Sequence, residues 1–257
     1  MSAAKRVSRK ERRIQRQQAR NGGESNGNVT EKLNFSLKYV DPLTVNQENT
    51  FRAWEDGQNL LLVGTAGTGK SFLSAYLGMK EILETKEQQK LAIVRSVVPT
   101  RDMGALPGSN KEKSKVYEAP YYSIFSELFG RGDAYDYLKN KGVVEFMTTS
   151  FVRGITINDC VILVDEFQNM TPSELHSVFT RIGKNCRVIF AGDIKQNDLN
   201  PRKEKSGFND FFKVINKMRD FRVIEFTRDD VVRSSLVKSY IIAREDLEDA
   251  GLISPLH

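Results

Sequence analysis

One short segment, Gly64-Thr-Ala-Gly-Thr-Gly-Lys-Ser71, limits what this chain can fold into more than any other. It directly follows the apolar run 60–63 and opens a helix-like segment. Glycines let backbone N–H groups turn inward around an anion, and a helix N-terminus adds partial positive charge. Lys70 can neutralise the β- and γ-phosphate oxygens of a nucleotide, and the Ser71 hydroxyl can bind Mg²⁺. The segment predicts a site for ATP and Mg²⁺ made by Gly64, Thr65, Ala66, Gly67, Thr68, Gly69, Lys70 and Ser71.

Short apolar runs suited to buried parallel strands recur along the chain. They occupy residues 60–63, 91–94, 143–146, 161–164, 188–190 and 223–226. Helix-like segments lie between most of them, such as 71–84 and 172–182, the second opened by the start signal Thr171-Pro-Ser-Glu174. This alternation predicts an α/β fold with three layers, in which helices cover both faces of a parallel sheet.

Two carboxylates, Asp165 and Glu166, end the apolar run 161–164. Asp165 can hold the water shell of Mg²⁺, and Glu166 can polarise an attacking water. A strand that ends in Asp-Glu is weak evidence alone, but downstream of a phosphate loop it favours hydrolysis over simple binding. Gln196 follows the run 188–190, where it can orient water or sense the γ-phosphate. The alternative for Gln196 is a glutamine in a surface turn.

Positive charge is concentrated at the N-terminus. Residues 1–28 contain eight Lys or Arg and two Glu, so they carry the whole net charge of +6. We expect a basic, disordered arm over 1–28, ending in the turn-rich linker 21–28, and one domain over 29–257. The arm has no aromatic residue, so it can track phosphates without stacking bases. The alternative is a solvated terminus with no partner.

Further features of the sequence bear on the partners and the location of the protein. The aromatic residues of 117–129 follow Lys111, Lys113 and Lys115, in a stretch that also contains Pro107-Gly-Ser-Asn110. This stretch is predicted to be a mobile loop whose aromatics stack bases, although the rings could equally pack in a core. No window approaches the ~18 apolar residues of a membrane span, and the N-terminus lacks the apolar core of a signal peptide. We expect a cytoplasmic protein whose Cys160 and Cys186 are reduced and lie away from the ligand site.

Taken together, the ordered motifs resemble the PhoH family of P-loop ATPases, which is related to the superfamily 1 helicase core. The resemblance covers about residues 40–245. Besides the phosphate loop it includes Thr44-Val-Asn-Gln47, Val94-Arg95, Gly104-Ala-Leu-Pro-Gly108, Pro120-Tyr121, Phe151-Val-Arg-Gly-Ile-Thr156, Asp165-Glu-Phe-Gln-Asn169, Thr180-Arg-Ile-Gly183, Gly192-Asp-Ile-Lys-Gln-Asn-Asp-Leu199, Ser206-Gly207 and Asp230-Val-Val-Arg233. It implies a RecA-like P-loop NTPase core, ATP hydrolysis, and unwinding of RNA or single-stranded nucleic acid. It also implies that Gln47, expected in a loop, pairs with adenine.

The resemblance also has a consequence for assembly. Superfamily 1 helicases place ATP between two RecA-like domains, and the second domain supplies an arginine that stabilises transition-state charge. Only one such domain fits in 257 residues. We therefore predict a ring-like homo-oligomer, a hexamer, in which Arg233, Arg181 or Arg153, in that order, acts in the site of the neighbouring subunit. Each of these could instead be an ordinary surface or ion-paired arginine.

Two classes of function remain open. The first is an ATPase motor that acts on RNA or single-stranded DNA, and the second is a nucleotide-switched regulatory or assembly protein with slow ATP turnover and a protein partner. Stimulation of ATP turnover by single-stranded RNA separates them. A small-molecule kinase is disfavoured by Glu166 and by the lack of an evident cluster of lid arginines.

Overall fold

The computed structural model describes residues 35–97, 110–193 and 207–254. The predicted arm 1–28 and Gln196 lie outside these residues, so the predictions about them stay predictions.

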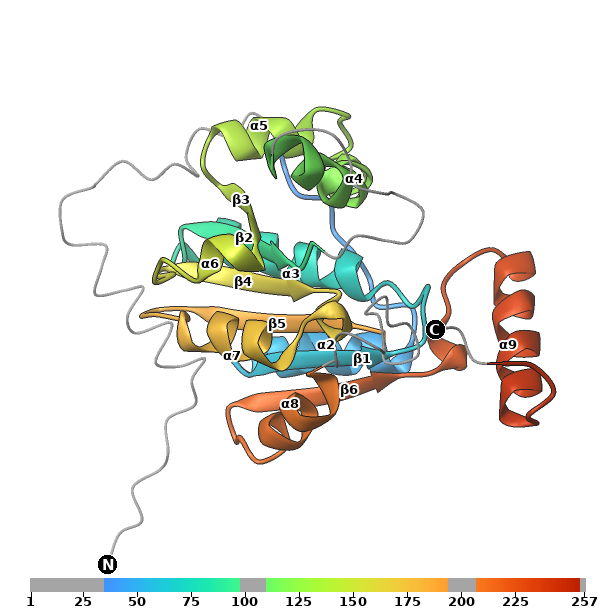
Figure 1. Cartoon of the computed structure of the whole chain (residues 1–257). Helices are drawn as coiled ribbons and strands as arrows, with labels where there is room; N and C mark the ends of the chain where they lie inside the picture. Colours follow the sequence, from blue (N-terminus) through green and yellow to red (C-terminus); the bar gives the residue numbers. More distant parts are fainter. Residues whose placement is uncertain (1–34, 98–109, 194–206, 255–257) are drawn as a thin grey trace, which may run out of the picture.

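The described chain is built around one parallel sheet of six strands in the order β3-β2-β4-β5-β1-β6 (Figure 1). Every pairing between neighbouring strands is parallel. The strands are β1 (Asn59–Gly64), β2 (Lys90–Arg95), β3 (Val144–Thr148), β4 (Cys160–Asp165), β5 (Arg187–Gly192) and β6 (Phe221–Phe226). Five strands contain a predicted apolar run, and β3 begins one residue into the run 143–146, so the α/β prediction is confirmed. In this order β5 separates the phosphate-loop strand β1 from the Asp-Glu strand β4, the arrangement of a RecA-like core.

Helices cover both faces of the sheet because the strands alternate side chains between two cores. Leu60 and Leu62 of β1 face one core, whereas Leu61 and Val63 face the other. The first face carries α2 (Val45–Glu55), α3 (Lys70–Thr85), α4 (Asn110–Phe129) and α5 (Ala134–Asn140). The second carries α6 (Thr149–Val152), η3 (Phe167–Asn169), α7 (Pro172–Thr180) and α8 (Phe208–Ile215). The predicted three layers are therefore present.

Local sequence signals set the start of helix α7 at the predicted residue. Helix α7 begins with a capping box in which Thr171 accepts from the Glu174 N–H while the Glu174 carboxylate accepts from the Thr171 N–H. Pro172 occupies the first turn of that helix, where its missing N–H costs nothing. The predicted start of this helix is thus confirmed.

The stretch 117–129 is a helix, and the prediction of a loop there was wrong. Tyr121, Phe125 and Phe129 recur every four residues along α4 and are buried in the first core. Tyr135 of α5 packs against Tyr121 and Phe125 at centroid distances of 6.3 and 5.3 Å. The alternative prediction, that these rings pack in a core, is the one the structure supports.

The chain leaves the sheet through η4 (Arg228–Asp230) and continues into α9 (Ser235–Asp249), which projects from the body at the right of Figure 1. None of the residues of α9 is buried. Among the helices of the described ranges, none combines the length and apolar character needed to cross a membrane.

A buried ion pair fastens the edge of the sheet at which the strands begin. The Arg187 guanidinium donates to Glu81 Oε2 at 2.7 Å and to the Trp54 carbonyl at 2.6 Å, and it stacks on the Trp54 ring at 3.3 Å. Both charged side chains are less than 8% exposed. The two cysteines lie at this same edge, with Cys160 opening β4 and Cys186 directly before β5, and both are free.

Neutralising one partner of this pair should destabilise the protein strongly. Glu81→Gln removes the charge that faces the buried Arg187 guanidinium at 2.7 Å, so we expect the free energy of unfolding in urea to fall by about 3 kcal/mol. Glu48→Gln is the control, because the exposed Glu48–Arg52 pair on α2 contributes about 0.5 kcal/mol or less. Equal effects of the two changes would contradict this role of the buried pair.

Candidate nucleotide site

The phosphate loop connects β1 to α3 through three glycines in the left-handed region. Their φ angles are +122° at Gly64, +76° at Gly67 and +85° at Gly69. Residues with a Cβ rarely adopt these angles. A Cβ on Gly64 would also lie 1.9 Å from the Phe226 carbonyl oxygen of β6. Glycine is therefore required both by the turn and by the close approach of the neighbouring strand.

Lys70 is the first residue of α3, and its ammonium group lies within the loop. Its Nζ donates to the carbonyls of Gly64 and Thr65 at 2.9 and 2.7 Å. Burial lowers the pKa of Lys70, and the nearby Asp193 and Glu166 carboxylates oppose that shift. The lysine is thus held at the centre of the loop, where its donors can reach phosphate oxygens.

Ser71 and Asp165 meet across the loop, as the sequence predicts. The Ser71 hydroxyl donates to Asp165 Oδ1 at 2.8 Å, and Asp165 is 4% exposed. Both supply the oxygen ligands that Mg²⁺ prefers, and Mg²⁺ binds proteins through one or two such groups plus substrate phosphates and water. These two residues therefore fit a magnesium site of the predicted kind.

Glu166 follows β4 in a left-handed conformation, with φ 52° and ψ 40°. Such a backbone costs about 1 kcal/mol or more in a residue other than glycine, and conformations of this kind cluster at functional sites. Its carboxylate accepts from Gln168 Nε2 at 2.5 Å and lies 3.9 Å from Arg95. Burial raises the pKa of Glu166, and the Asp165 carboxylate raises it further, while Arg95 opposes both. A carboxylate so placed is suited to accept a proton from water.

Gln168 connects the ends of two strands, a link that sequence reasoning did not find. Besides its bond to Glu166, its Oε1 accepts from the Asp193 N–H at 3.1 Å. Asp193 follows β5 directly and is 6% exposed. The position predicted for Gln196, three residues beyond Asp193, lies outside the described residues.

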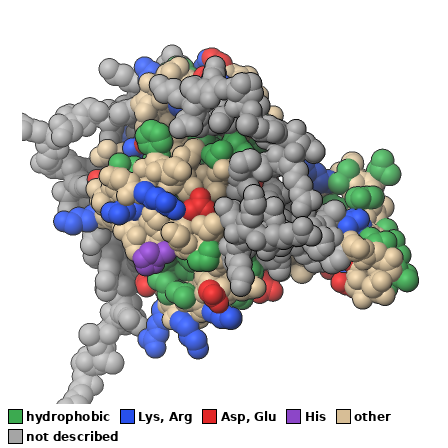
Figure 2. Space-filling view, viewed as in Figure 1, with side chains coloured by type: hydrophobic (Ala, Val, Ile, Leu, Met, Phe, Trp, Pro, Cys, Tyr) green, Lys and Arg blue, Asp and Glu red, His purple; other side chains and the backbone are tan. Residues whose placement is uncertain are grey.

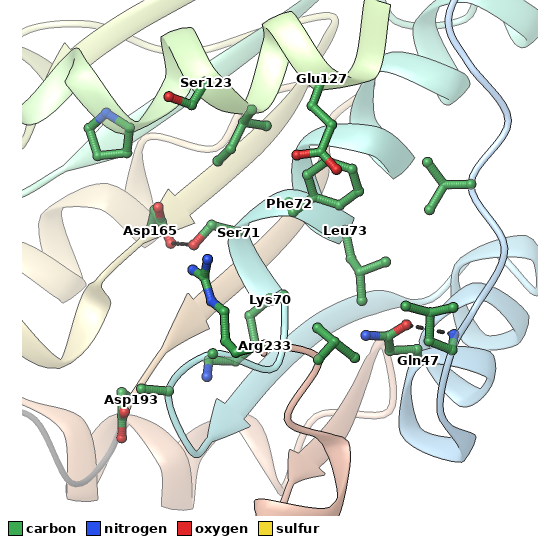
Figure 3. Close-up of a pocket in the computed structure, with 18 of the residues that line it drawn as sticks. Gln47, Lys70, Ser71, Phe72, Leu73, Ser123, Glu127, Asp165, Asp193 and Arg233 are labelled. Atoms are coloured by element: carbon green, nitrogen blue, oxygen red, sulfur yellow. Dashed lines mark hydrogen bonds between the residues drawn. The ribbon is translucent and has the colours of Figure 1, made fainter. Parts of the chain in front are cut away.

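A cavity of about 590 Å³ opens over the loop, a size suited to a small-molecule ligand. Figure 3 shows Lys70, Ser71 and Asp165 on one side of it, with Ser123 and Glu127 of α4 above them. The 40–43 segment and Gln47 form its far end, and Glu166, Asp193 and Arg233 also line it. The cavity therefore brings together the phosphate loop, both predicted carboxylates and the predicted adenine contact.

Gln47 lies on helix α2 rather than in the predicted loop. Thr44 caps this helix by accepting from the Gln47 N–H. The Gln47 side chain accepts from the Leu43 N–H at 2.8 Å (Figure 3). It also donates to the Thr68 carbonyl at 3.1 Å. An amide has two donor and two acceptor positions, so one of each is left after these bonds. Its pairing with adenine stays a prediction.

The three candidate arginines lie in different places. Arg233 lines the cavity of its own chain: its Cγ lies 3.0 Å from where a Cβ on Gly67 would stand, and the preceding Val232 N–H donates to the Gly67 carbonyl. This differs from the expectation that Arg233 serves a neighbouring subunit. Arg181 ends α7 near the amino end of β4, away from the cavity, and Arg153 ends α6 and is exposed. Neither contributes to the cavity of its own chain.

Two other residues of the site carried no predicted role. Tyr121 donates to Asp165 Oδ2 at 2.7 Å, and Arg95 lies beside Glu166. Arg95 pairs with Asp165 in the β2–β4 register. Each of these residues directly follows an apolar run of the same length, 91–94 or 161–164, and this match could have indicated that Arg95 lies at the same edge as the carboxylates. Tyr121 comes from α4, and nothing in local sequence shows that this helix turns back onto β4.

A RecA-like parallel sheet with a phosphate loop after β1 and paired carboxylates at the carboxyl end of β4 defines the class of P-loop nucleotide-binding proteins. The family model described as PhoH-like protein matches residues 39–245. The chain belongs to this family, which confirms the resemblance found in its sequence.

Curated relatives agree with this placement. The chain is 31% identical over 215 residues to the PhoH-like protein of Mycobacterium tuberculosis (strain CDC 1551 / Oshkosh), covering 83% of this chain and 60% of the relative. It is 31% identical over 211 residues to that of Bacillus subtilis (strain 168), covering 82% and 65%. Protein PhoH of Escherichia coli (strain K12) is 32% identical over 192 residues, covering 74% and 54%. The chain thus spans less than two thirds of the length of these relatives.

Among solved structures, the chain is similar to a Pif1 helicase from Bacteroides in complex with ADP-AlF3 and ssDNA. That likeness has 15% identity and a TM-score of 0.38, and it covers 82% of this chain and 49% of the other. Pif1 helicase from Candida albicans matches with 16% identity and a TM-score of 0.37, covering 74% and 42%.

Adding a methyl group at Gly64 should damage both the fold and the site. In Gly64→Ala the new Cβ meets the Phe226 carbonyl, so β1 and β6 must separate or the loop must change its path. We expect a loss of about 2 kcal/mol or more in urea unfolding and at least ~10-fold weaker nucleotide binding. Gly132→Ala is the control, because a Cβ there meets nothing within 4 Å. Wild-type affinity in Gly64→Ala would contradict this account of the loop.

Proposed function

We propose that this chain is a Mg²⁺-dependent ATPase that acts as a motor on RNA or single-stranded nucleic acid. In this proposal, six copies of the chain assemble into a ring. The observation that carries the proposal is the position of Glu166, which lies at the carboxyl end of β4 beside Asp165 and shares a cavity with Lys70. A protein that only binds nucleotide needs the phosphate loop and a metal ligand. It does not need a second carboxylate held at the same edge.

The chain's own residues divide the work of hydrolysis. Lys70 and the loop N–H groups bind and orient the phosphates, and Ser71 with Asp165 would hold Mg²⁺, which neutralises charge on the β- and γ-oxygens when it is bound. Glu166 accepts a proton from the attacking water at its carboxylate. Gln168 and Arg95 hold that carboxylate in place.

Removing the proposed base should stop turnover while leaving binding intact. Glu166→Gln keeps the size of the side chain, so we expect ATP hydrolysis to fall by about 10²-fold or more and the affinity for ATP to change little. The assay is phosphate release with and without single-stranded RNA. Stimulation of the wild type by RNA supports a motor, whereas unstimulated, slow turnover favours the nucleotide-switched regulatory protein. Normal hydrolysis by Glu166→Gln would exclude this residue as the base.

A ring is supported by the C-terminal helix. Helix α9 exposes Leu236 and Tyr240, which are 79% and 64% accessible, and Figure 2 shows apolar side chains gathered over it. The Thr65 hydroxyl donates to Glu245 of the same helix, so α9 lies beside the phosphate loop. A second copy of the chain that covers α9 would therefore lie next to the nucleotide site. Light scattering after size exclusion, with and without ATP, measures the subunit number.

Mixing two inactive variants can show whether Arg233 acts in its own subunit. Arg233→Ala is expected to lower turnover by ~10³-fold, the contribution of a transition-state arginine. Because Arg233 lines the cavity of its own chain, we expect a mixture of Arg233→Ala and Glu166→Gln subunits to stay inactive. If Arg233 served a neighbour, about a quarter of the interfaces in an equal mixture would hold both intact groups, and activity would return.

A further inference from the structure

Helix α4 reaches the site in two ways at once. Its residues Pro120, Ser123, Ile124 and Glu127 form one wall of the cavity (Figure 3). Its residues Tyr117 and Tyr121, one helical turn apart, reach the ends of β2 and β4. The helix thus contacts both the space for the nucleotide and the side chains that surround the two carboxylates.

Tyr121 fixes the orientation of Asp165. The tyrosine is fully buried, and its hydroxyl donates to Asp165 Oδ2 at 2.7 Å. The other carboxylate oxygen, Oδ1, accepts from Ser71 at 2.8 Å. Rotation of a carboxylate about its last side-chain bond is otherwise only weakly restricted. Because both oxygens are engaged, Oδ1 is directed at Ser71 and at the position expected for Mg²⁺.

Arg95 forms the second link, to Glu166. Its Nη2 lies 3.9 Å from Glu166 Oε1, and its Nη1 donates to the Tyr117 carbonyl at 3.4 Å. The guanidinium carbon also lies 5.9 Å from the centre of the Tyr117 ring. Arg95 is therefore held between α4 and the carboxylate. A shift of α4 would displace the charge that faces Glu166.

We propose that Tyr121 and Arg95 are positioning residues, through which α4 fixes Asp165 and Glu166 in the orientation needed for nucleotide hydrolysis. This inference rests on the proposed ATPase function. It adds that the orientation of the carboxylates depends on a helix outside the loop and the β4 end. Since the same helix lines the cavity, a nucleotide that contacts α4 meets the element that orients both carboxylates.

The test separates binding with Mg²⁺ from binding without it. A fluorescent, non-hydrolysable ATP analogue is titrated against the full chain in Mg²⁺ and in EDTA. In Tyr121→Phe the ring still packs beside Tyr135 and Phe146, and only the bond to Asp165 is lost. We expect the gain in affinity from Mg²⁺ to fall about tenfold, with affinity in EDTA unchanged.

Tyr122→Phe is the matched control. This neighbour on the same helix is exposed, and its hydroxyl donates to Asp136 at 3.1 Å rather than to Asp165. It should keep the full gain from Mg²⁺. A Tyr121→Phe protein that also keeps the full gain overturns the role of Tyr121. Failure of the wild type to bind the analogue at all would instead overturn the proposed function.

Variants of Arg95 provide a second, independent test of the proposal, which can be carried out even if Tyr121→Phe does not fold. Arg95→Gln should lower kcat about tenfold or more with KM little changed, because the nucleotide-binding groups stay in place. Arg95→Lys keeps a positive charge near Glu166 and should recover part of the lost kcat. Wild-type kcat in Arg95→Gln, or no recovery in Arg95→Lys, would overturn the role of Arg95.

Discussion

The site depends on parallel strands that end at one edge of a single sheet. β1 delivers the phosphate loop, β4 delivers Asp165 and Glu166, and β5 between them delivers Asp193. Along the chain, these carboxylates follow the phosphate loop by about 100 residues or more. Only the common edge brings Ser71 within 2.8 Å of Asp165. Had β4 paired antiparallel, its carboxylates would lie at the opposite edge, where Cys160 and Arg187 now stand.

The backbone at this edge turns through left-handed conformations, and the core underneath stabilises them. Gly64 turns through a conformation that only glycine adopts with ease, and Glu166 occupies the left-handed region despite its side chain. The strands that precede them, β1 and β4, are buried almost throughout. Burial of these strands on both faces stabilises the sheet and so allows the two turns to persist. The geometry of the candidate site is thus a consequence of a well-packed interior.

Two segments outside the sheet complete the site from opposite sides. Helix α4 forms one wall of the cavity and holds Asp165 through Tyr121, whereas the segment before α9 packs on Gly67 and brings Arg233 over the loop. Both contacts act on groups that are proposed to bind or activate the nucleotide. The exposed α9 extends this second side to the surface, where a neighbouring subunit could meet it. Nucleotide binding and contact with a partner are therefore expected to influence each other.

The sequence by itself determined the strands, the phosphate loop and the carboxylate pair, because apolar runs and a fixed glycine spacing express local requirements of the backbone. It did not determine that residues 117–129 form a buried helix, since Tyr121 and Phe125 could stack bases or fill a core with equal local plausibility. Nor could it show that Tyr121 reaches Asp165, or that Arg233 lies in its own cavity, because these contacts join segments far apart in the chain. Tertiary packing decided them: the aromatic face of α4 is buried only when the helix folds back over the sheet, and this brings its hydroxyl to the carboxylate.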